Sequence, residues 1–152
     1  TCGSQLVFSG TNFNFFTKLI GDQYPQYKPV MEKEGFLPAT VAKGSMVKTL
    51  KRAGCLLAGQ FVSTSFFFKP GKIDIALHNK EVGKLDESLE LDKFEGENFE
   101  SKFYSPYLLN GLQVFDDKDL SFHIKNAAKP IIFESEHDDF IMTYLVMPVY
   151  TT

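Results

Sequence analysis

A single pattern occurs twice in this sequence: a strand, a helix and three further strands. The predicted helices cover 46–58 and 107–115. The predicted strands of the first copy cover 37–43, 60–68, 72–79 and 83–91. Those of the second copy cover 98–104, 120–126, 129–136 and 140–149. The repeat of about 55–60 residues indicates an internal duplication, and we predict an α+β domain with two helices packed on antiparallel sheet.

The two helices are predicted from apolar residues at helical spacing. The first apolar stripe consists of Met46, Val47, Leu50, Ala53 and Leu57. The second consists of Leu108, Leu109, Leu112 and Phe115. Ser45 is the predicted N-cap of the first helix and Gly59 its stop. Ser105 is the predicted N-cap of the second helix, where Pro106 suits the first helical position.

The first thirty residues do not belong to this pattern. Residues 4–16 read as two short strands with a turn at 9–11, which is typical of a hairpin. Gly21, Pro25 and Pro29 interrupt the segment that follows, so we interpret it as a connector. Because two strands alone cannot bury a core, this part is predicted to be the end of a preceding domain.

Charge and cysteine content exclude several classes of protein. The net charge of −3 and pI of about 5.6 provide no overall attraction to nucleic acid or anionic lipid, so such binding needs a local patch. Cys2 and Cys55 form no disulfide framework and have no metal-ligand spacing, which favours a reducing, cytoplasmic compartment. No apolar stretch reaches the ~20 residues that span a bilayer, so no membrane partner is predicted.

The sequence favours a protein without catalytic activity. It contains no glycine-rich phosphate loop and no CxxC, HExxH or GxSxG motif. One dense polar cluster, ESEHDDF at 134–140, could ligate a hard cation. A charged loop between two strands explains the same residues. The alternative function is therefore a small metal-binding hydrolase that uses Glu134, Glu136, His137 and Asp138, within the run from Glu134 to Asp139.

The first helix carries a basic face opposite its apolar stripe. Lys48, Lys51 and Arg52 lie on this face. Such a face can neutralise phosphates and bind DNA without reading its sequence. A solvated helix surface is the other interpretation, and the residues alone leave both open.

The chain ends in an apolar segment, FIMTYLVMPVYTT. Alternation in a strand accounts for Tyr144 and Val146, because every second side chain faces the core. It does not account for Leu145, Met147 and Val149. Either both faces of this strand are covered, or one face forms a groove that methionine lines well.

Taken together, four stretches resemble the bacterial sliding clamp, the beta subunit of DNA polymerase III. They are FTKLIGDQYPQY, the Leu-Lys-Arg-Ala helix ahead of Phe61, FYSPYLLNGL and the closing TYLVMPV. The resemblance covers nearly the whole chain and implies the DNA clamp fold. It implies that residues 1–28 are the end of the middle domain and that 29–152 are the C-terminal domain. It also implies a processivity factor without cofactor or enzymatic activity, whose subunits close head-to-tail into a homodimeric ring around duplex DNA.

The resemblance further implies a peptide groove that docks the replicative polymerase and clamp-loader subunits through short linear motifs. One wall of this groove would consist of Leu145, Val146, Met147, Pro148 and Val149. The facing positions would be Pro25, Val30, Phe61, Tyr107, Ala128 and Pro130. Tyr104, beside the groove, stands where the family usually has a small amide residue. A standalone peptide-binding module that keeps the groove without joining a ring is a third possibility.

Two further surfaces follow from the resemblance. The helices of the family line the channel, so Lys48, Lys51 and Arg52 become candidates for DNA phosphate contacts. The C-terminal domain meets the next subunit edge to edge. The candidates for that subunit interface are Cys55, Leu56, Glu81, Asp86 and Glu87.

Overall fold

A computed structural model describes residues 3–150, which form two compact units that divide between Val30 and Met31. Cys2, Thr151 and Thr152 lie outside the described residues. Within the described part, no helix is long and apolar enough to cross a membrane.

The first unit is a two-stranded hairpin followed by a connector. Strands β1 (Gln5–Gly10) and β2 (Phe13–Lys18) pair antiparallel, as the sequence predicts, but the turn lies at residues 11–12 instead of 9–11. Aromatic side chains on both strands are more than half exposed: Phe8, Phe13, Phe15 and Phe16. The connector ends in a short 3-10 helix, η1 (Lys28–Val30). That this unit completes a preceding domain stays a prediction.

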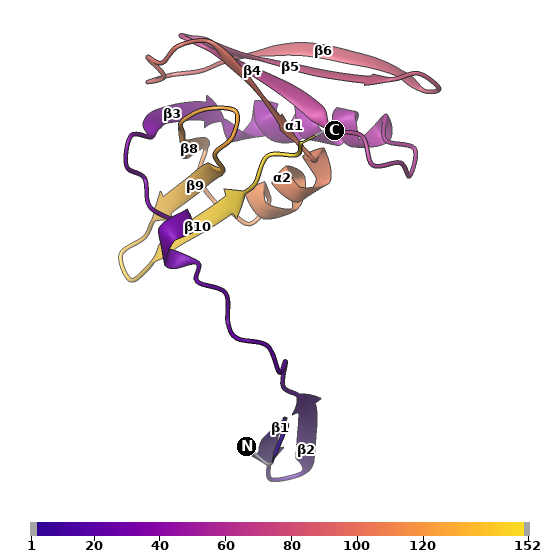
Figure 1. The fold of residues 1–152 in the computed structure, drawn as a ribbon, viewed down its shortest axis with the longest axis vertical. Helices are drawn as coiled ribbons and strands as arrows, with labels where there is room; N and C mark the ends of the chain where they lie inside the picture. Colours follow the sequence, from indigo (N-terminus) through magenta and orange to yellow (C-terminus); the bar gives the residue numbers. More distant parts are fainter. Residues whose placement is uncertain (1–2, 151–152) are drawn as a thin grey trace. The chain divides into compact units, whose positions relative to one another are not determined.

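The second unit contains two four-stranded antiparallel sheets (Figure 1). One sheet has the order β6-β5-β4-β7, formed by Gly83–Glu90, Lys72–Asn79, Thr64–Lys69 and Phe99–Phe103. The other has the order β10-β9-β8-β3, formed by Ile141–Val146, Ile131–Glu136, Asp119–Ile124 and Leu37–Ala42. Each sheet therefore combines three strands of one copy of the duplicated pattern with the first strand of the other copy. This exchange interlocks the copies into one domain.

Short backbone pairs cover the outer edge of each exchanged strand. Thr40 of β3 and Asp92 exchange two N–H···O=C hydrogen bonds of 2.9 Å. On β7, the Lys102 carbonyl accepts a 2.7 Å hydrogen bond from the Val149 N–H. Asp92 follows β6 and Val149 follows β10. In both copies, therefore, the segment after the last strand bonds to the first strand of the same copy, which lies at the edge of the opposite sheet. The segment after β10 is consequently attached to the opposite sheet.

The two helices confirm the predicted α+β duplication, although their ends differ from the prediction. Helix α1 covers Lys43–Cys55, three residues earlier than expected. Ser45 is not its N-cap: Ala42 is, and the Lys43 N–H donates to the Lys118 carbonyl instead of to a side chain. The chain then leaves the helix before Gly59, which still provides a positive φ of 77° in the turn.

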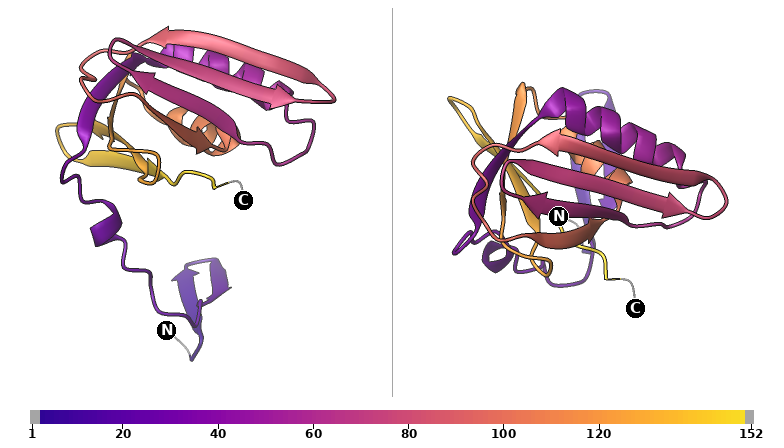
Figure 2. Two further views of the ribbon diagram at one scale, coloured as in Figure 1. Left: turned by 45° about the horizontal axis from the view of Figure 1, so that its top comes forward. Right: turned by 90° about the horizontal axis from the view of Figure 1, so that it is seen from above.

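Helix α2 covers Ser105–Leu112 and is shorter than predicted. Its N-cap is Tyr104, while the Ser105 side chain is fully buried and hydrogen-bonds the Thr64 hydroxyl. After Leu112 the chain turns so that Phe115 enters the core, and the Lys43 ammonium donates to the Phe115 carbonyl. Figure 2 shows α1 and α2 from two further directions.

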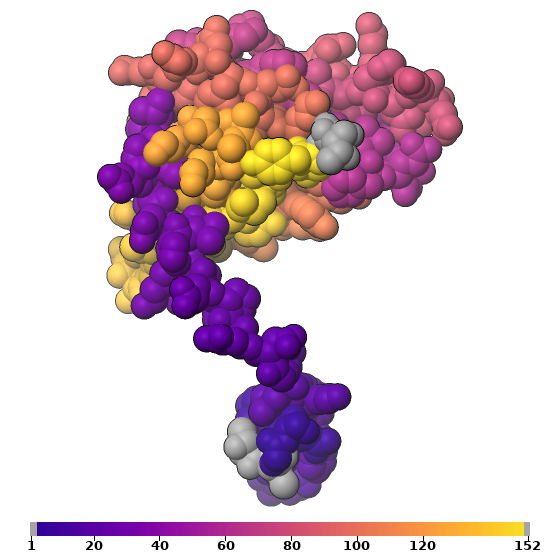
Figure 3. All heavy atoms as spheres, in the orientation of Figure 1, coloured from indigo at the N-terminus to yellow at the C-terminus, as the bar shows by residue number. Residues whose placement is uncertain are grey.

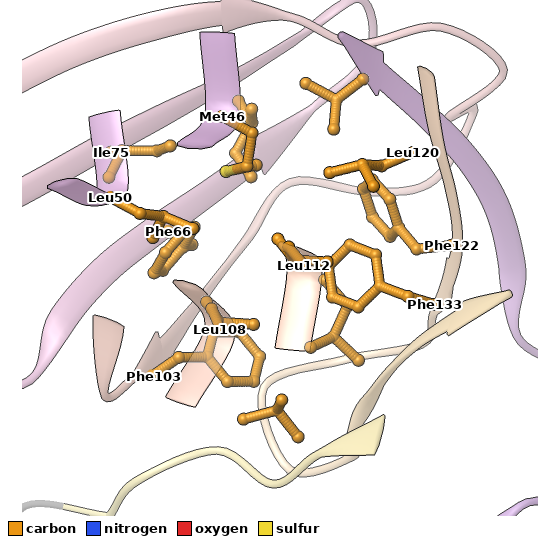
Figure 4. Packing of buried hydrophobic residues seen from close by; sticks show 14 of the residues in the cluster. Met46, Leu50, Phe66, Ile75, Phe103, Leu108, Leu112, Leu120, Phe122 and Phe133 are labelled. Atoms are coloured by element: carbon orange, nitrogen blue, oxygen red, sulfur yellow. The ribbon is translucent and has the colours of Figure 1, made fainter. Parts of the chain in front are cut away.

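One hydrophobic core joins both sheets and both helices (Figure 4). Phe122 of β8 lies between Phe68 of β4, at a ring-centroid distance of 6.3 Å, and Phe133 of β9, at 5.3 Å. The helices contribute their predicted apolar faces, including Leu50 and Leu112, both 0% exposed. Burial of each such side chain contributes about 1.5–3 kcal/mol. This core provides the rigid support for the surface described next.

Candidate functional site

The segment from β10 to Tyr150 runs along the start of α2 and the end of β7. The Tyr144 hydroxyl donates a 2.7 Å hydrogen bond to the Tyr107 carbonyl, and the Val149 N–H bonds to Lys102. Residues 145–148 therefore pass beside the residues that join β7 to α2. Figure 3 shows this segment in yellow at the surface of the second unit.

The side chains of this segment alternate between the core and the surface. Val146 is 4% exposed and Pro148 is buried as well, so both support the segment from inside rather than line an open groove. Met147 between them is 52% exposed, and Leu145 and Val149 are half-buried. The surface of this wall is thus provided by three of the five predicted residues.

Three aromatic rings gather at the junction of β7 and α2, which residues 145–148 pass. Phe61 stacks on Tyr104 at a centroid distance of 4.4 Å and an interplanar angle of 22°. Tyr104 meets Tyr107 edge-on, at 5.0 Å and 80°. Phe61 and Tyr107 remain 62% and 56% exposed. We call Phe61, Tyr104 and Tyr107 the aromatic shelf.

The remaining predicted groove residues are in two places. Ala128 is exposed, and its carbonyl accepts a 3.1 Å hydrogen bond from the Tyr150 hydroxyl, whereas Pro130 is buried. A hollow of about 210 Å³ lies there, lined by Glu100, Ser101, Lys102, Ala127, Val149 and Tyr150. Pro25 and Val30 belong to the first unit, where both are exposed.

Tyr144 fixes the spacing between β10 and α2. Its ring lies directly against Gly111, where an added Cβ would be 2.0 Å from the ring carbon Cε1. Burial raises the pKa of Tyr144, so its hydroxyl stays protonated as the donor to Tyr107. Neither contact is evident from the sequence, because Tyr144 lies 33 and 37 residues from these partners, by subtraction of the residue numbers.

The basic face of α1 divides into free and paired cations. Lys48 and Lys51 are exposed and lie one helical turn apart. Arg52 instead forms a two-point ion pair with Glu87 of β6, whose carboxylate also accepts a 2.5 Å hydrogen bond from the Thr49 hydroxyl. The sequence predicts that Arg52 faces DNA and that Glu87 faces a second subunit. In the structure these two side chains form an ion pair with each other.

The other predicted interface residues border the same edge strand. Cys55 is exposed and Leu56 half-buried at the end of α1. Glu81 and Asp86 are exposed, and the Gln60 amide donates to Glu81 at 3.2 Å. Because β6 is the last strand of its sheet, its outer backbone edge is available for pairing.

The acidic cluster at 134–140 does not assemble a cation site. The Glu134 carboxylate is paired with Lys33 at 2.6 Å, and the Ser135 hydroxyl lies 3.1 Å from the His137 ring. Within residues 3–150, no three His, Cys, Asp or Glu side chains are placed to hold a metal ion. His123 lies 3.7 Å from Glu134, and burial, with a smaller effect of the Lys33 charge, lowers its pKa. The metal-binding hydrolase is not favoured.

Residues 30–150 match the family described as DNA polymerase III beta subunit, C-terminal domain. The chain belongs to this family. The beta sliding clamp of Bacillus subtilis is 25% identical over 150 residues, which covers 97% of this chain and 39% of that protein. A sliding-clamp chain therefore extends well beyond the region matched here, and this sequence spans about two fifths of it.

Solved sliding-clamp structures have the same fold as this family member. The Bacillus subtilis clamp superposes with a TM-score of 0.79 at 25% identity, covering 98% of this chain and 40% of that one. The Caulobacter crescentus clamp, with polyethylene glycol bound in its proposed beta-motif tethering region, has a TM-score of 0.79 at 25% identity. That alignment covers 91% of this chain and 36% of the Caulobacter chain.

The ion pair between α1 and β6 makes the stability of this clamp-family domain pH-dependent. Hydrogen bonding by Arg52, and less so by Thr49, lowers the pKa of Glu87 below the usual value of about 4.3. Since the folded pKa is depressed, the stabilisation is present above pH ~4.3 and is lost as the pH falls through the folded pKa.

We expect Glu87→Gln to lower the thermal unfolding midpoint at pH 7, and this difference to shrink by pH 3. Glu90→Gln on the same strand is the matched control. A midpoint difference for Glu87→Gln that is equal at both pH values would refute the assignment.

Proposed function

We propose that this chain acts as the C-terminal part of a sliding-clamp subunit, without catalytic activity. In the assembled clamp, two subunits would close head-to-tail into a ring around duplex DNA and keep the replicative polymerase attached. Membership of the beta-subunit family supports this proposal. The observation that carries it is the segment 145–149, which is held against α2 and β7 with Met147 exposed beside the aromatic shelf.

Partner docking is the activity that this surface fits. Leu145, Met147 and Val149 with the aromatic shelf offer apolar surface within the second unit. A short linear motif with leucine and phenylalanine anchors would bury its side chains here, and this burial would provide the affinity. Polymerase and clamp-loader subunits are the proposed partners. The Caulobacter clamp, which carries polyethylene glycol in its proposed tethering region, is consistent with an accessible site in this family.

The docking proposal is tested by a fluorescence titration. The chain contains no tryptophan, so a tryptophan-labelled Gln-Leu-Xaa-Leu-Phe peptide can be observed without background. We expect saturable binding that weakens at least about tenfold in Phe61→Ala and Met147→Ala, as for buried anchors of an interface. Phe140→Ala is the matched control, since that ring is 58% exposed at the far end of β10. Equal binding by all four proteins would contradict docking at this surface.

The proposed DNA contacts are the two exposed lysines of α1, which form no ion pair in the described structure. We propose that Lys48 and Lys51 contact phosphates weakly and without sequence preference, which suits a protein that slides. Arg52 would strengthen this face only by leaving Glu87. The edge of β6, with Cys55, Leu56, Glu81 and Asp86 around it, is the proposed contact with the neighbouring subunit.

The DNA proposal predicts a change in salt dependence. With duplex DNA at low ionic strength, Lys48→Ala and Lys51→Ala should each weaken binding and reduce the slope of log K against log[salt] by about 1. Lys80→Ala, in the turn between β5 and β6, should leave the slope unchanged. Fluorescence anisotropy over a series of salt concentrations measures the slope. If all three variants have the slope of the parent, Lys48 and Lys51 are not phosphate contacts.

A further inference from the structure

The backbone of Tyr104, the central residue of the aromatic shelf, is anchored by the residues on both sides of it. Tyr104 lies between two fully buried residues: Phe103 ends β7 in the core, and Ser105 bonds to Thr64. Its carbonyl also accepts a 3.0 Å hydrogen bond from the Tyr107 N–H. The Tyr104 backbone is therefore fixed by the core on both sides.

Phe61, in contrast, depends on Tyr104 for its position. It lies in the irregular segment 60–63 between α1 and β4, where neither a helix nor a strand fixes it. Its ring contacts Tyr104 face to face, with centroids 4.4 Å apart, and is still 62% exposed. Tyr104 thus holds one face of Phe61 while the other side of the ring remains open to solvent.

Because its rings can make stacked and edge-on contacts, this surface should bind an aromatic side chain more tightly than an aliphatic one. An aromatic partner on the shelf gains about 0.5–1.5 kcal/mol beyond its buried area, whereas an aliphatic partner gains the area alone. The gain requires rings in a defined orientation, and Tyr104 defines it. Helix α2 carries no lysine or arginine, and Lys102, two residues before Tyr104, lies 4.0 Å from the Glu100 carboxylate, so little free positive charge beside the shelf is available for the phosphates of a nucleic acid. These properties favour a peptide over a nucleobase.

We propose that Tyr104 is a specificity-determining residue of the docking surface, because it orients Phe61 to select an aromatic side chain in the partner peptide. This proposal rests on the proposed docking function and adds a preference to it. The preferred motif has an aromatic residue at a position outside its leucine and phenylalanine anchors. An aliphatic residue at that position binds more weakly.

The test compares peptides that differ at one position. Each non-anchor position of the tryptophan-labelled peptide is replaced in turn by tyrosine or leucine, and the ratio of the two dissociation constants is measured. For the parent chain we expect tyrosine to be preferred about 2- to 12-fold at one position at least. Tyr104→Phe should keep this ratio because the ring remains. Tyr104→Leu should reduce it to near 1, because an aliphatic side chain replaces the ring on which Phe61 stacks.

The controls distinguish this proposal from the docking proposal. The methyl NMR signal of Met46, a residue 2% exposed in the core, reports whether Tyr104→Leu is folded. An unchanged ratio in folded Tyr104→Leu, or a ratio of 1 at every position in the parent, overturns the role of Tyr104 while docking stands. If Phe61→Ala and Met147→Ala both bind as the parent does, or if no peptide binds, docking fails and this proposal fails with it. Displacement of the peptide by a single-stranded oligonucleotide would also overturn it, because the shelf would then bind bases.

Discussion

Replacing Phe122 with alanine should lower the free energy of unfolding by about 3–5 kcal/mol. Phe122 is 1% exposed and contacts Phe68 of one sheet and Phe133 of the other, so its ring joins the two halves of the core. Its removal leaves a cavity that neither sheet can fill, because the strands on each side are fixed by their own ladders. A loss of this size is a large fraction of the ~5–15 kcal/mol that stabilises a typical domain.

Urea unfolding measures this effect as a lower midpoint with an unchanged slope. Phe61→Ala is the matched control, since it removes the same ring from a position that is 62% exposed. We expect Phe61→Ala to change stability by less than about 1 kcal/mol while it weakens peptide binding. A loss below about 1 kcal/mol for Phe122→Ala would mean that the sheets do not share one core.

The second large effect is expected for Gly111→Ala, which should destabilise the domain by about 1–3 kcal/mol. The new Cβ would be 2.0 Å from Cε1 of the Tyr144 ring, so either α2 or β10 has to move. Alanine favours a helix over glycine by up to about 1 kcal/mol, and the clash must exceed this gain. Movement of β10 would also displace residues 145–149 and weaken peptide docking.

Gly54→Ala in α1 provides the opposite case. Apart from its chain neighbours and the backbone of its own helix, no heavy atom lies within 4 Å of its added Cβ, so the helix gain is not offset by a clash. We expect Gly54→Ala to raise the unfolding midpoint slightly and Gly111→Ala to lower it, both measured by thermal unfolding. If both variants are stabilised, the Tyr144 ring does not rest on Gly111.

The sequence predicts the order of elements well because each element has a local signal. Helical spacing identifies α1 and α2, and alternation identifies strands such as β5, whose predicted bounds match the structure. The exchange of β3 and β7 between the sheets could not be predicted. Alternation in a strand defines which face is buried but not which strand is its neighbour.

The candidate site was predictable in part for similar reasons. Alternation correctly identifies Val146 as buried and applies equally to Pro148 two residues later, although Pro148 follows the end of β10 and the return of the chain to β7 holds it in place. Arg52 is a residue of the type that contacts DNA phosphates. Its ion pair with Glu87 could not be predicted, because the two residues are 35 positions apart in sequence. The stacking of Tyr104 on Phe61 likewise depends on tertiary packing across 43 positions, by subtraction of their residue numbers.

Methionine methyl NMR tests the docking claim most directly. The chain has four methionines, and two of them form a matched pair: Met147 is 52% exposed beside the aromatic shelf, and Met46 is buried in the core. Addition of the Gln-Leu-Xaa-Leu-Phe peptide to millimolar concentration should shift the Met147 signal in a saturable way and leave the Met46 signal in place. This result would establish docking at the segment 145–149. A Met147 signal that does not move at the highest peptide concentration would contradict the docking function proposed for this chain.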